Sequence, residues 1–180
     1  MEQTLEQLQY PIGKYEAPTA MTPELVKEWI AVLDALPSWM DVCIENLDEE
    51  QLKVPYREGG WNTQQVIHHL ADSHMNAYVR LKLALTEDTP IVKPYAEAAW
   101  AELIDTQIVP VNVSVTMLHA MHRRMVVILQ NISENDWHRS YFHPEHKRKF
   151  PIWEVVALYA WHSRHHTEHI RRLRERMNWR

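Results

Sequence analysis

The sequence predicts an all-α fold, a four-helix bundle formed by one domain over residues 1–180. Three observations predict it: 46% of the 180 residues are hydrophobic, only three are glycine, and four segments repeat apolar side chains at helical spacing. A chain of this length has material for one buried core, and scarce glycine with prolines at segment edges favours long helices. Residues 1–21 are expected to form an N-terminal extension that packs on the bundle.

The first two helices have marked beginnings. Thr22 is placed to cap a helix whose first residue is Pro23 and whose apolar pattern continues toward Ile44. Asn62 follows a pair of glycines and can cap the second helix, while Gln65 completes a capping box. The start of the second helix is the best-marked boundary in the chain.

The remaining boundaries follow from apolar periodicity and from proline. The second helix is expected to end near Leu85, the third to cover residues 114–132, and the fourth to run from about 151 to 177. Pro37 lies inside the first helix and is expected to kink or restart it.

The connections between helices predict an up-down-down-up topology. Residues 86–113 are too many for a turn between antiparallel neighbours, and could span the length of a helix of this size, about 35 Å. They are therefore expected to form a long crossover that makes the second and third helices parallel. Residues 133–150 are also long for a turn, and the stretch 141–146 is expected to form a small hairpin.

Composition excludes several classes of protein. Lys and Arg total 19 against 24 Asp and Glu, a net charge of −5 that does not favour nucleic acid as a partner. Three glycines cannot supply a dinucleotide-binding or Walker phosphate loop. No apolar run predicts a membrane span, and the N-terminus lacks a signal-peptide pattern. The single cysteine, Cys43, is expected in the core of a cytoplasmic protein without internal disulfides.

Histidine is the compositional anomaly. Twelve occur, and seven of them lie in the windows 68–74 and 162–169. On a helical wheel His162 and His166 fall within about 20° of the inward stripe, and His169 within about 40°. Buried imidazoles cost free energy unless each finds a partner, so a bound divalent cation is the simplest explanation. The i, i+4 spacing of His162 and His166 places two ring nitrogens on one helix face, as in zinc-chelating helices.

A third ligand must come from another helix, and the wheel leaves two candidates open. His69 and His74 flank the inward stripe of the second helix, whereas His68 points away from it. His74 is also consistent with a hydrogen-bonded core residue, as is His122. The histidines expected at the rim or beside the site are His165 and His169; those expected on the surface or in loops are His119, His138, His143 and His146.

Three stretches resemble a known family: YREGGWNTQQVIHHLADSHMNAYVRLKLALTED from Tyr56, YFHPEHKRKF from Tyr141, and LYAWHSRHHTEHI from Leu158. The chain is similar to the DinB superfamily, in its YfiT-like branch of metal-dependent hydrolases. The resemblance implies a DinB-like bundle, commonly a homodimer, with one divalent metal ion per subunit, zinc or nickel. By motif its ligands are His69, His162 and His166.

The resemblance and the open coordination positions lead to three functional hypotheses. The first is a hydrolase in which the metal activates water toward a small-molecule substrate. The second is an S-transferase that conjugates a low-molecular-weight thiol, of the bacillithiol or glutathione type, to an electrophile. The third is binding without catalysis. No Glu separates His162 from His166 and Asp72 is expected to point outward, which leaves no evident general base. Trp61, Trp100 and Trp161 could line a cosubstrate pocket or be core or interface residues.

Overall fold

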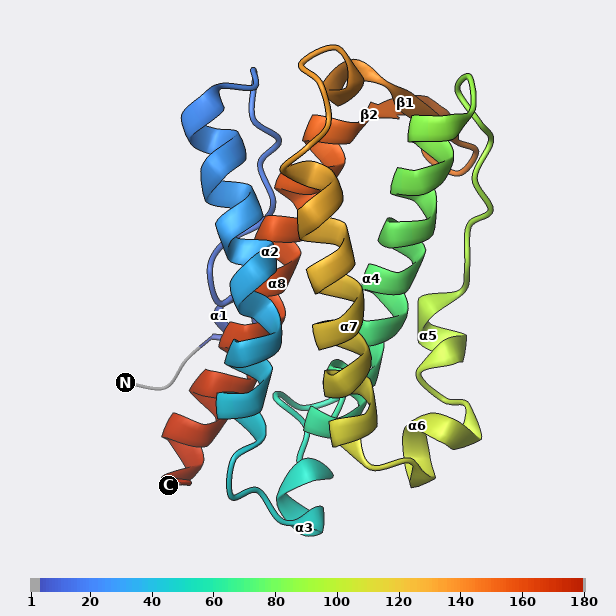
Figure 1. Cartoon of the computed structure of the whole chain (residues 1–180). Coiled ribbons are helices and arrows are strands. Elements are labelled where there is room, and N and C mark those ends of the chain that lie inside the picture. Colours follow the sequence, from blue (N-terminus) through green and yellow to red (C-terminus); the bar gives the residue numbers. More distant parts are fainter. Residues whose placement is uncertain (1–3, 180) are drawn as a thin grey trace.

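Four long helices form the body of the protein in a computed structural model that describes residues 4–179. They are α2 (Pro23–Ile44), α4 (Thr63–Thr86), α7 (Val111–Leu129) and α8 (Ile152–Met177). In Figure 1, α2 and α8 run from top to bottom, whereas α4 and α7 run from bottom to top. Helices α2 and α4 each pack against both α7 and α8. The all-α, up-down-down-up prediction is confirmed.

The predicted caps begin α2 and α4. The Thr22 hydroxyl accepts a hydrogen bond from the Leu25 amide, and Asn62 forms a capping box with Gln65. Gln65 also holds the crossover, because its side-chain amide donates to the carbonyl of Ala101, at 3.2 Å. The start of α4 is therefore held both by its own capping box and by a hydrogen bond to the crossover that passes over it.

Helix α7 begins and ends earlier than predicted. The helix covers Val111–Leu129, three residues before the expected 114–132 at each end, because Pro110 adopts the extended conformation of a cap residue. Ser114, the expected start, lies in the first turn, and its hydroxyl is 2.7 Å from a ring nitrogen of His68. Ser114 is therefore engaged by a neighbouring helix and does not mark the end of its own.

Pro37 does not restart α2. The helix continues through this buried proline as one element from Pro23 to Ile44. Proline has no backbone N–H, so the carbonyl of Leu33 lacks the donor that normally stands four residues later. This carbonyl is free to accept a hydrogen bond from outside the helix.

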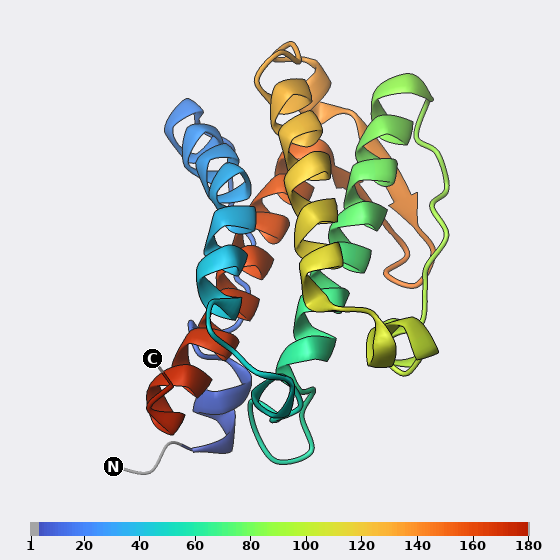
Figure 2. The same ribbon diagram turned by 60° about the horizontal axis from the view of Figure 1, so that its bottom comes forward.

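The crossover and the hairpin complete the connections. The crossover carries two short helices, α5 (Glu97–Trp100) and α6 (Ile104–Ile108), and passes outside α4 in both Figure 1 and Figure 2. After the short 3-10 helix η1 (Asp136–His138), strand β1 (Ser140–His143) pairs antiparallel with β2 (Arg148–Pro151), which confirms the predicted hairpin. Val92 of the crossover donates to the Phe142 carbonyl, so the hairpin also ties the crossover to α8.

Besides α5 and α6, two further short helices, α1 (Leu5–Gln9) and α3 (Glu49–Leu52), are absent from the sequence prediction. Each begins with a capping box, Thr4 with Gln7 and Asp48 with Gln51. The described part of the N-terminal extension lies against α8, where the Gln9 carbonyl is 3.1 Å from Nε2 of His169. No helix among the described residues is long and apolar enough to cross a membrane.

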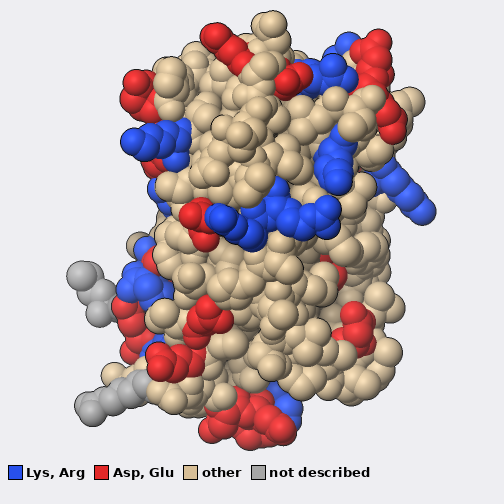
Figure 3. All heavy atoms as spheres, in the orientation of Figure 1, with Lys and Arg blue, Asp and Glu red and all other residues tan. Residues whose placement is uncertain are grey.

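The core consists of two apolar halves with histidines between them. One half lies toward the hairpin and includes Leu33, Leu81 and Met125; the other includes Leu70 and Leu118. Along α4 the two halves are separated by His74, and along α7 by His122; both rings are almost completely buried. On the face shown in Figure 3, acidic and basic side chains are interspersed.

Candidate metal centre

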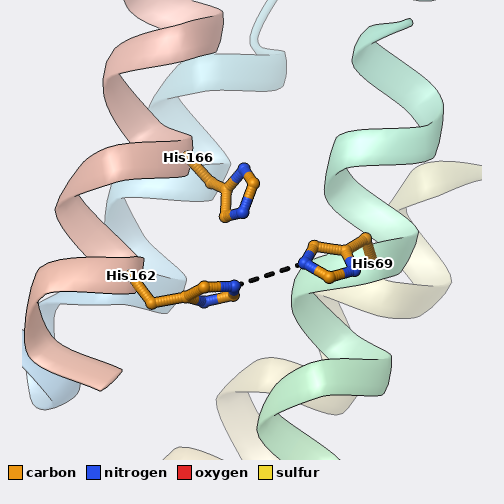
Figure 4. Close-up of side chains that lie close together, drawn as sticks. All are labelled: His69, His162 and His166. Atoms are coloured by element: carbon orange, nitrogen blue, oxygen red, sulfur yellow. Dashed lines mark hydrogen bonds between the residues drawn. The ribbon is translucent and has the colours of Figure 1, made fainter. Parts of the chain in front are cut away.

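Helices α4 and α8 bring three histidines to one place. The capped start of α4 places His69 two turns into that helix, and α8 presents His162 and His166 on consecutive turns. The two helices run antiparallel (Figure 1), and a distance of 3.2 Å between Nε2 of His69 and Nε2 of His162 places these positions at the same level of the bundle. Figure 4 shows the rings of His162 and His166 directed across toward His69.

The distances suit one metal ion. One ring nitrogen from each of His69, His162 and His166 lies within 4.8 Å of the other two. Nε2 of His69 is 3.2 Å from Nε2 of His162, and the ring centroids of His162 and His166 are 4.5 Å apart. Two nitrogens that share a tetrahedral zinc ion at about 2.0–2.1 Å lie about 3.3 Å apart, so small adjustments suffice.

Burial keeps these imidazoles neutral. Desolvation lowers the pKa of His69 to about 4, and it lowers the pKa of His162 and His166 well below the ordinary value, with the neighbouring imidazoles acting in the same direction. A neutral imidazole offers the lone pair that a metal requires. Trp61 packs against His69 with ring centroids 4.6 Å apart and covers this imidazole. The donor set therefore fits a divalent cation.

The structure distinguishes between His69 and His74, the two candidates that the helical wheel leaves open for the third ligand. His74 is fully buried and lies outside the three-histidine group, with Nε2 3.2 Å from Nδ1 of His162 and Nδ1 3.0 Å from Nε2 of His122. His122 is a hydrogen-bonded core residue, as expected. That His69, His162 and His166 bind metal stays a prediction; the structure brings the three together.

His165 and His169 form a second group with His166. One nitrogen from each of the three lies within 4.8 Å of the others, and His166 is common to both groups. His169 donates from Nε2 to the Gln9 carbonyl, and its Nδ1 is 3.4 Å from Nδ1 of His166. His165, expected at the rim or beside the site, lies beside it and is buried, and its ring stacks on Trp161 at 4.4 Å. The N-terminal segment covers it, through Tyr10, which helix periodicity alone could not show.

His68 and His143 are buried outside the histidine groups. The wheel predicts that His68 points away from the inward stripe of α4, and its ring contacts Val109 of the crossover and Ser114 of α7, which bury it on that side. Its Nε2 lies 3.1 Å from the Val109 carbonyl. His143 is expected on the surface or in a loop, and this prediction is wrong, because His143 is the last residue of strand β1 and is buried in the hairpin. His119 matches its surface prediction, where it lies 2.7 Å from Asp41.

Carboxylates take no part in either histidine group. Each possible metal-ligating group found among residues 4–179 consists of histidines alone. Asp72 is half-buried rather than outward, and burial together with the charge of Asp105 raises its pKa to about 6. Asp105 lies on α6, so Asp72 belongs to the crossover side of α4. Of the three tryptophans, Trp161 stacks on His165, Trp61 packs at a tilt against His69, and Trp100 contacts Tyr95 in the crossover.

Comparison with known proteins identifies the family. A family model described as the DinB superfamily matches residues 33–170, which include all three histidines of the candidate centre. The chain belongs to the DinB superfamily. This DinB chain is 45% identical over 175 residues to a protein of Bacillus mycoides strain KBAB4 named "Putative metal-dependent hydrolase", and the match covers 97% of this chain and 100% of the relative.

Two further proteins are similar to this chain over almost its whole length. A protein of Bacillus cereus strain ATCC 10987 with the same name is 46% identical over 176 residues, covering 97% of this chain and 100% of its own. Among solved structures, YfiT from Bacillus subtilis superposes with a TM-score of 0.94 at 41% identity, covering 97% of this chain and 99% of that one. YfiT is described as a probable metal-dependent hydrolase with an unusual four-helix bundle topology.

Proposed function

We propose that this chain is a metal-dependent hydrolase in which His69, His162 and His166 hold one divalent ion per subunit, zinc or nickel. The observation that carries the proposal is the meeting of three neutral imidazoles from α4 and α8, two buried and that of His162 partly buried, with ring nitrogens within 4.8 Å of one another. Relatives named for metal-dependent hydrolysis, similar over 97% of the chain, support the same reaction class.

The donor set determines what chemistry the site supports. A divalent ion held by three neutral nitrogens keeps its double charge, retains open coordination positions, acts as a Lewis acid and lowers the pKa of a bound water or thiol. The side chains of the protein hold and shield that centre. His162 and His166 are fixed on consecutive turns of α8, and Trp61 excludes water from one side of His69. The substrate is a small molecule that reaches the remaining positions.

A thiol S-transferase is the second candidate, and one observation favours it. The histidine groups found in residues 4–179 contain no carboxylate, and Asp72 lies toward Asp105 on the crossover side of α4. Hydrolysis gains from a nearby general base, whereas a thiol that is ionised at the centre attacks an electrophile with less help. The cosubstrate would be a low-molecular-weight thiol of the bacillithiol or glutathione type. Metal binding without catalysis is the third outcome.

Metal analysis tests the ligand set. Protein purified without a polyhistidine tag is expected to carry about one divalent ion per chain, and His69→Ala and His162→Ala are expected to lose it. His68→Phe is the matched control, because His68 is equally buried on α4 but contacts Val109 and Ser114 instead. Unchanged metal content in both ligand variants would refute the assignment.

Turnover assays separate the reaction classes. The metal-loaded protein is incubated with ester and amide substrates, and separately with an electrophile plus glutathione or bacillithiol. Metal-dependent hydrolysis without thiol is the expected result. Conjugate formation with no hydrolysis would replace the first proposal by the second, and the absence of both activities would favour binding alone.

We also propose a homodimer in solution. Several large apolar side chains are exposed on α6 and the first half of α7: Ile104, Ile108, Val113 and Met117. Light scattering coupled to size exclusion is expected to give twice the 21.5 kDa mass of the chain. A monomer mass at micromolar concentration would contradict this.

A further inference from the structure

A line of hydrogen bonds runs from the candidate centre into the core. Nδ1 of His162 lies 3.2 Å from Nε2 of His74, and Nδ1 of His74 lies 3.0 Å from Nε2 of His122. Nδ1 of His122 ends the line, 2.6 Å from the carbonyl of Leu33 on α2. His74 and His122 are 0% and 1% exposed, so water does not compete for these contacts. Three histidines from three helices are thus connected to a fourth helix.

The carbonyl at the end sets the direction of every bond in the line. A carbonyl only accepts, so Nδ1 of His122 carries the proton and donates. A neutral imidazole has one N–H, which leaves Nε2 of His122 as the acceptor for the Nδ1–H of His74. His74 then accepts at Nε2 from the Nδ1–H of His162. The result is a free lone pair on Nε2 of His162, the nitrogen that faces His69.

The reverse assignment of donors and acceptors along the line is excluded at the Leu33 carbonyl. It would place a lone pair of His122 against the carbonyl oxygen of Leu33 at 2.6 Å, with no proton between them. Double protonation of His122 is disfavoured because burial lowers its pKa to about 4. The line therefore has one self-consistent arrangement of protons when its histidines are neutral.

Pro37 explains why Leu33 can serve as the anchor. In a regular helix the Leu33 carbonyl would accept from the backbone N–H four residues later, and that residue is Pro37, which has none. A proline ring inside a helix also clashes with the carbonyl four residues earlier, which here is that of Leu33. The place where α2 lacks an internal hydrogen bond is the place where His122 binds.

We propose that His74 and His122 are positioning residues, which hold His162 in the tautomer with a free Nε2 and fix its ring toward the centre. The inference deepens the proposed metal site and rests on it. Ligand imidazoles are generally oriented by a hydrogen bond from their second nitrogen to a carboxylate, a carbonyl or water. Here two further imidazoles stand between the ligand and the carbonyl.

His166, the other proposed ligand on α8, is connected to a backbone carbonyl by a shorter line of hydrogen bonds. Nδ1 of His166 lies 3.4 Å from Nδ1 of His169, which donates from Nε2 to the Gln9 carbonyl. The same reasoning gives a protonated Nδ1 and a free Nε2 on His166. Both ligands of α8 are thus connected through histidine to a backbone carbonyl of another segment.

Cobalt affinity tests the positioning role. Co²⁺ is titrated into tag-free, metal-free wild type and into His74→Phe and His122→Phe, which keep a ring of similar size but cannot continue the line. Both variants are expected to bind Co²⁺ about 10- to 100-fold more weakly, the range found when the orienting partner of a ligand is lost. His68→Phe, which also removes a buried hydrogen-bonded histidine of α4, is expected to match wild type.

A rescue variant separates positioning from packing. His122→Gln offers both an amide donor for Leu33 and an oxygen acceptor for His74. It is expected to bind Co²⁺ more tightly than His122→Phe, with circular dichroism showing that each variant is folded. Equal affinities in wild type, His74→Phe and His122→Phe would overturn the positioning role alone. Failure of wild type to bind Co²⁺ would overturn the metal site and this role together.

Nitrogen-15 spectra of histidine in the zinc-loaded wild type give a direct readout. The expected result is a slowly exchanging proton on Nδ1 of each of His162, His74 and His122, with none on Nε2 of His74. A proton on Nε2 of His74 would reverse the line and overturn the inference.

Discussion

Three neighbouring histidines of α4 differ in what their ring nitrogens contact. His68 donates from Nε2 to the Val109 carbonyl and accepts at Nδ1 from the Ser114 hydroxyl, so both nitrogens are occupied by α7 and its leading loop. His69 directs Nε2 toward His162, and His74 lies between His162 and His122. A structural residue, a candidate ligand and a positioning residue therefore occupy two turns of one helix.

Ser114→Ala is expected to destabilise the protein without affecting metal binding. The substitution leaves Nδ1 of the buried His68 without its donor, which costs about 1–3 kcal/mol for an unsatisfied buried group. Urea denaturation of metal-free protein measures the free energy of unfolding. Thr116→Ala is the control on the same helix, because its exposed hydroxyl bonds only the carbonyl of Asn112, and its effect should stay within about 0.5 kcal/mol. Equal effects of the two variants would contradict the role of Ser114.

Part of the site could be predicted residue by residue. The i, i+4 spacing on an amphipathic helix placed His162 and His166 inward, but the wheel left His69 and His74 open, because both flank the stripe. Family motifs, rather than geometry, favoured His69. The burial of His68 and His165 depends on the crossover and the N-terminal segment, and helix periodicity carries no information about segments that fold over a helix from outside.

At the scale of elements, Pro37 connects α2 to the candidate centre. Pro37→Ala restores a backbone N–H that competes with His122 for the Leu33 carbonyl. Since a carbonyl has two lone pairs, we expect a Co²⁺ affinity loss of less than about 10-fold, smaller than that of His122→Phe. The measurement is the same Co²⁺ titration. An affinity above that of wild type would show that the missing N–H is no help to the line.

Elements with strong local signals could be predicted, and weakly periodic ones could not. Caps at Thr22 and Asn62 located α2 and α4. The capping boxes of α1 and α3 are equally clear in the sequence, yet these helices have no buried residue, so apolar periodicity does not reveal them. The predicted start of α7, residue 114, is three residues late because apolar periodicity alone, without a cap signal, located it.

For the molecule as a whole, the histidines that lie between the two apolar halves of the core, here called the histidine layer, make the free energy of unfolding depend on proton binding. Burial lowers the pKa of His69, His122 and His169 to about 4, and that of His165 to about 3. In the unfolded chain these groups titrate near the ordinary value, about 6.5. Below pH 6.5 the unfolded state therefore binds protons that the folded state does not.

The sign of the pH dependence follows. Stability is full above pH 6.5 and falls as the pH falls toward 4, by about 1.4 kcal/mol per pH unit for each such histidine. Asp72 acts in the opposite direction, because its pKa is raised to about 6 and its protonation favours the folded state. The stability gained when one carboxylate is protonated is smaller than the stability lost through four histidines. Metal-free protein in EDTA is expected to show a urea midpoint that decreases steeply between pH 7 and pH 5.

A single substitution tests whether the histidine layer causes this dependence. His165 stacks on Trp161, and its Nδ1 has no hydrogen-bond partner among the described residues, so His165→Phe can keep the stack without losing a bond at that atom. The variant removes one titrating group from the unfolded chain, and the slope of unfolding free energy between pH 6 and pH 5 should decrease by about 1.4 kcal/mol per pH unit. A slope that is unchanged, while the variant remains folded at pH 7, would show that His165 does not contribute to the acid sensitivity.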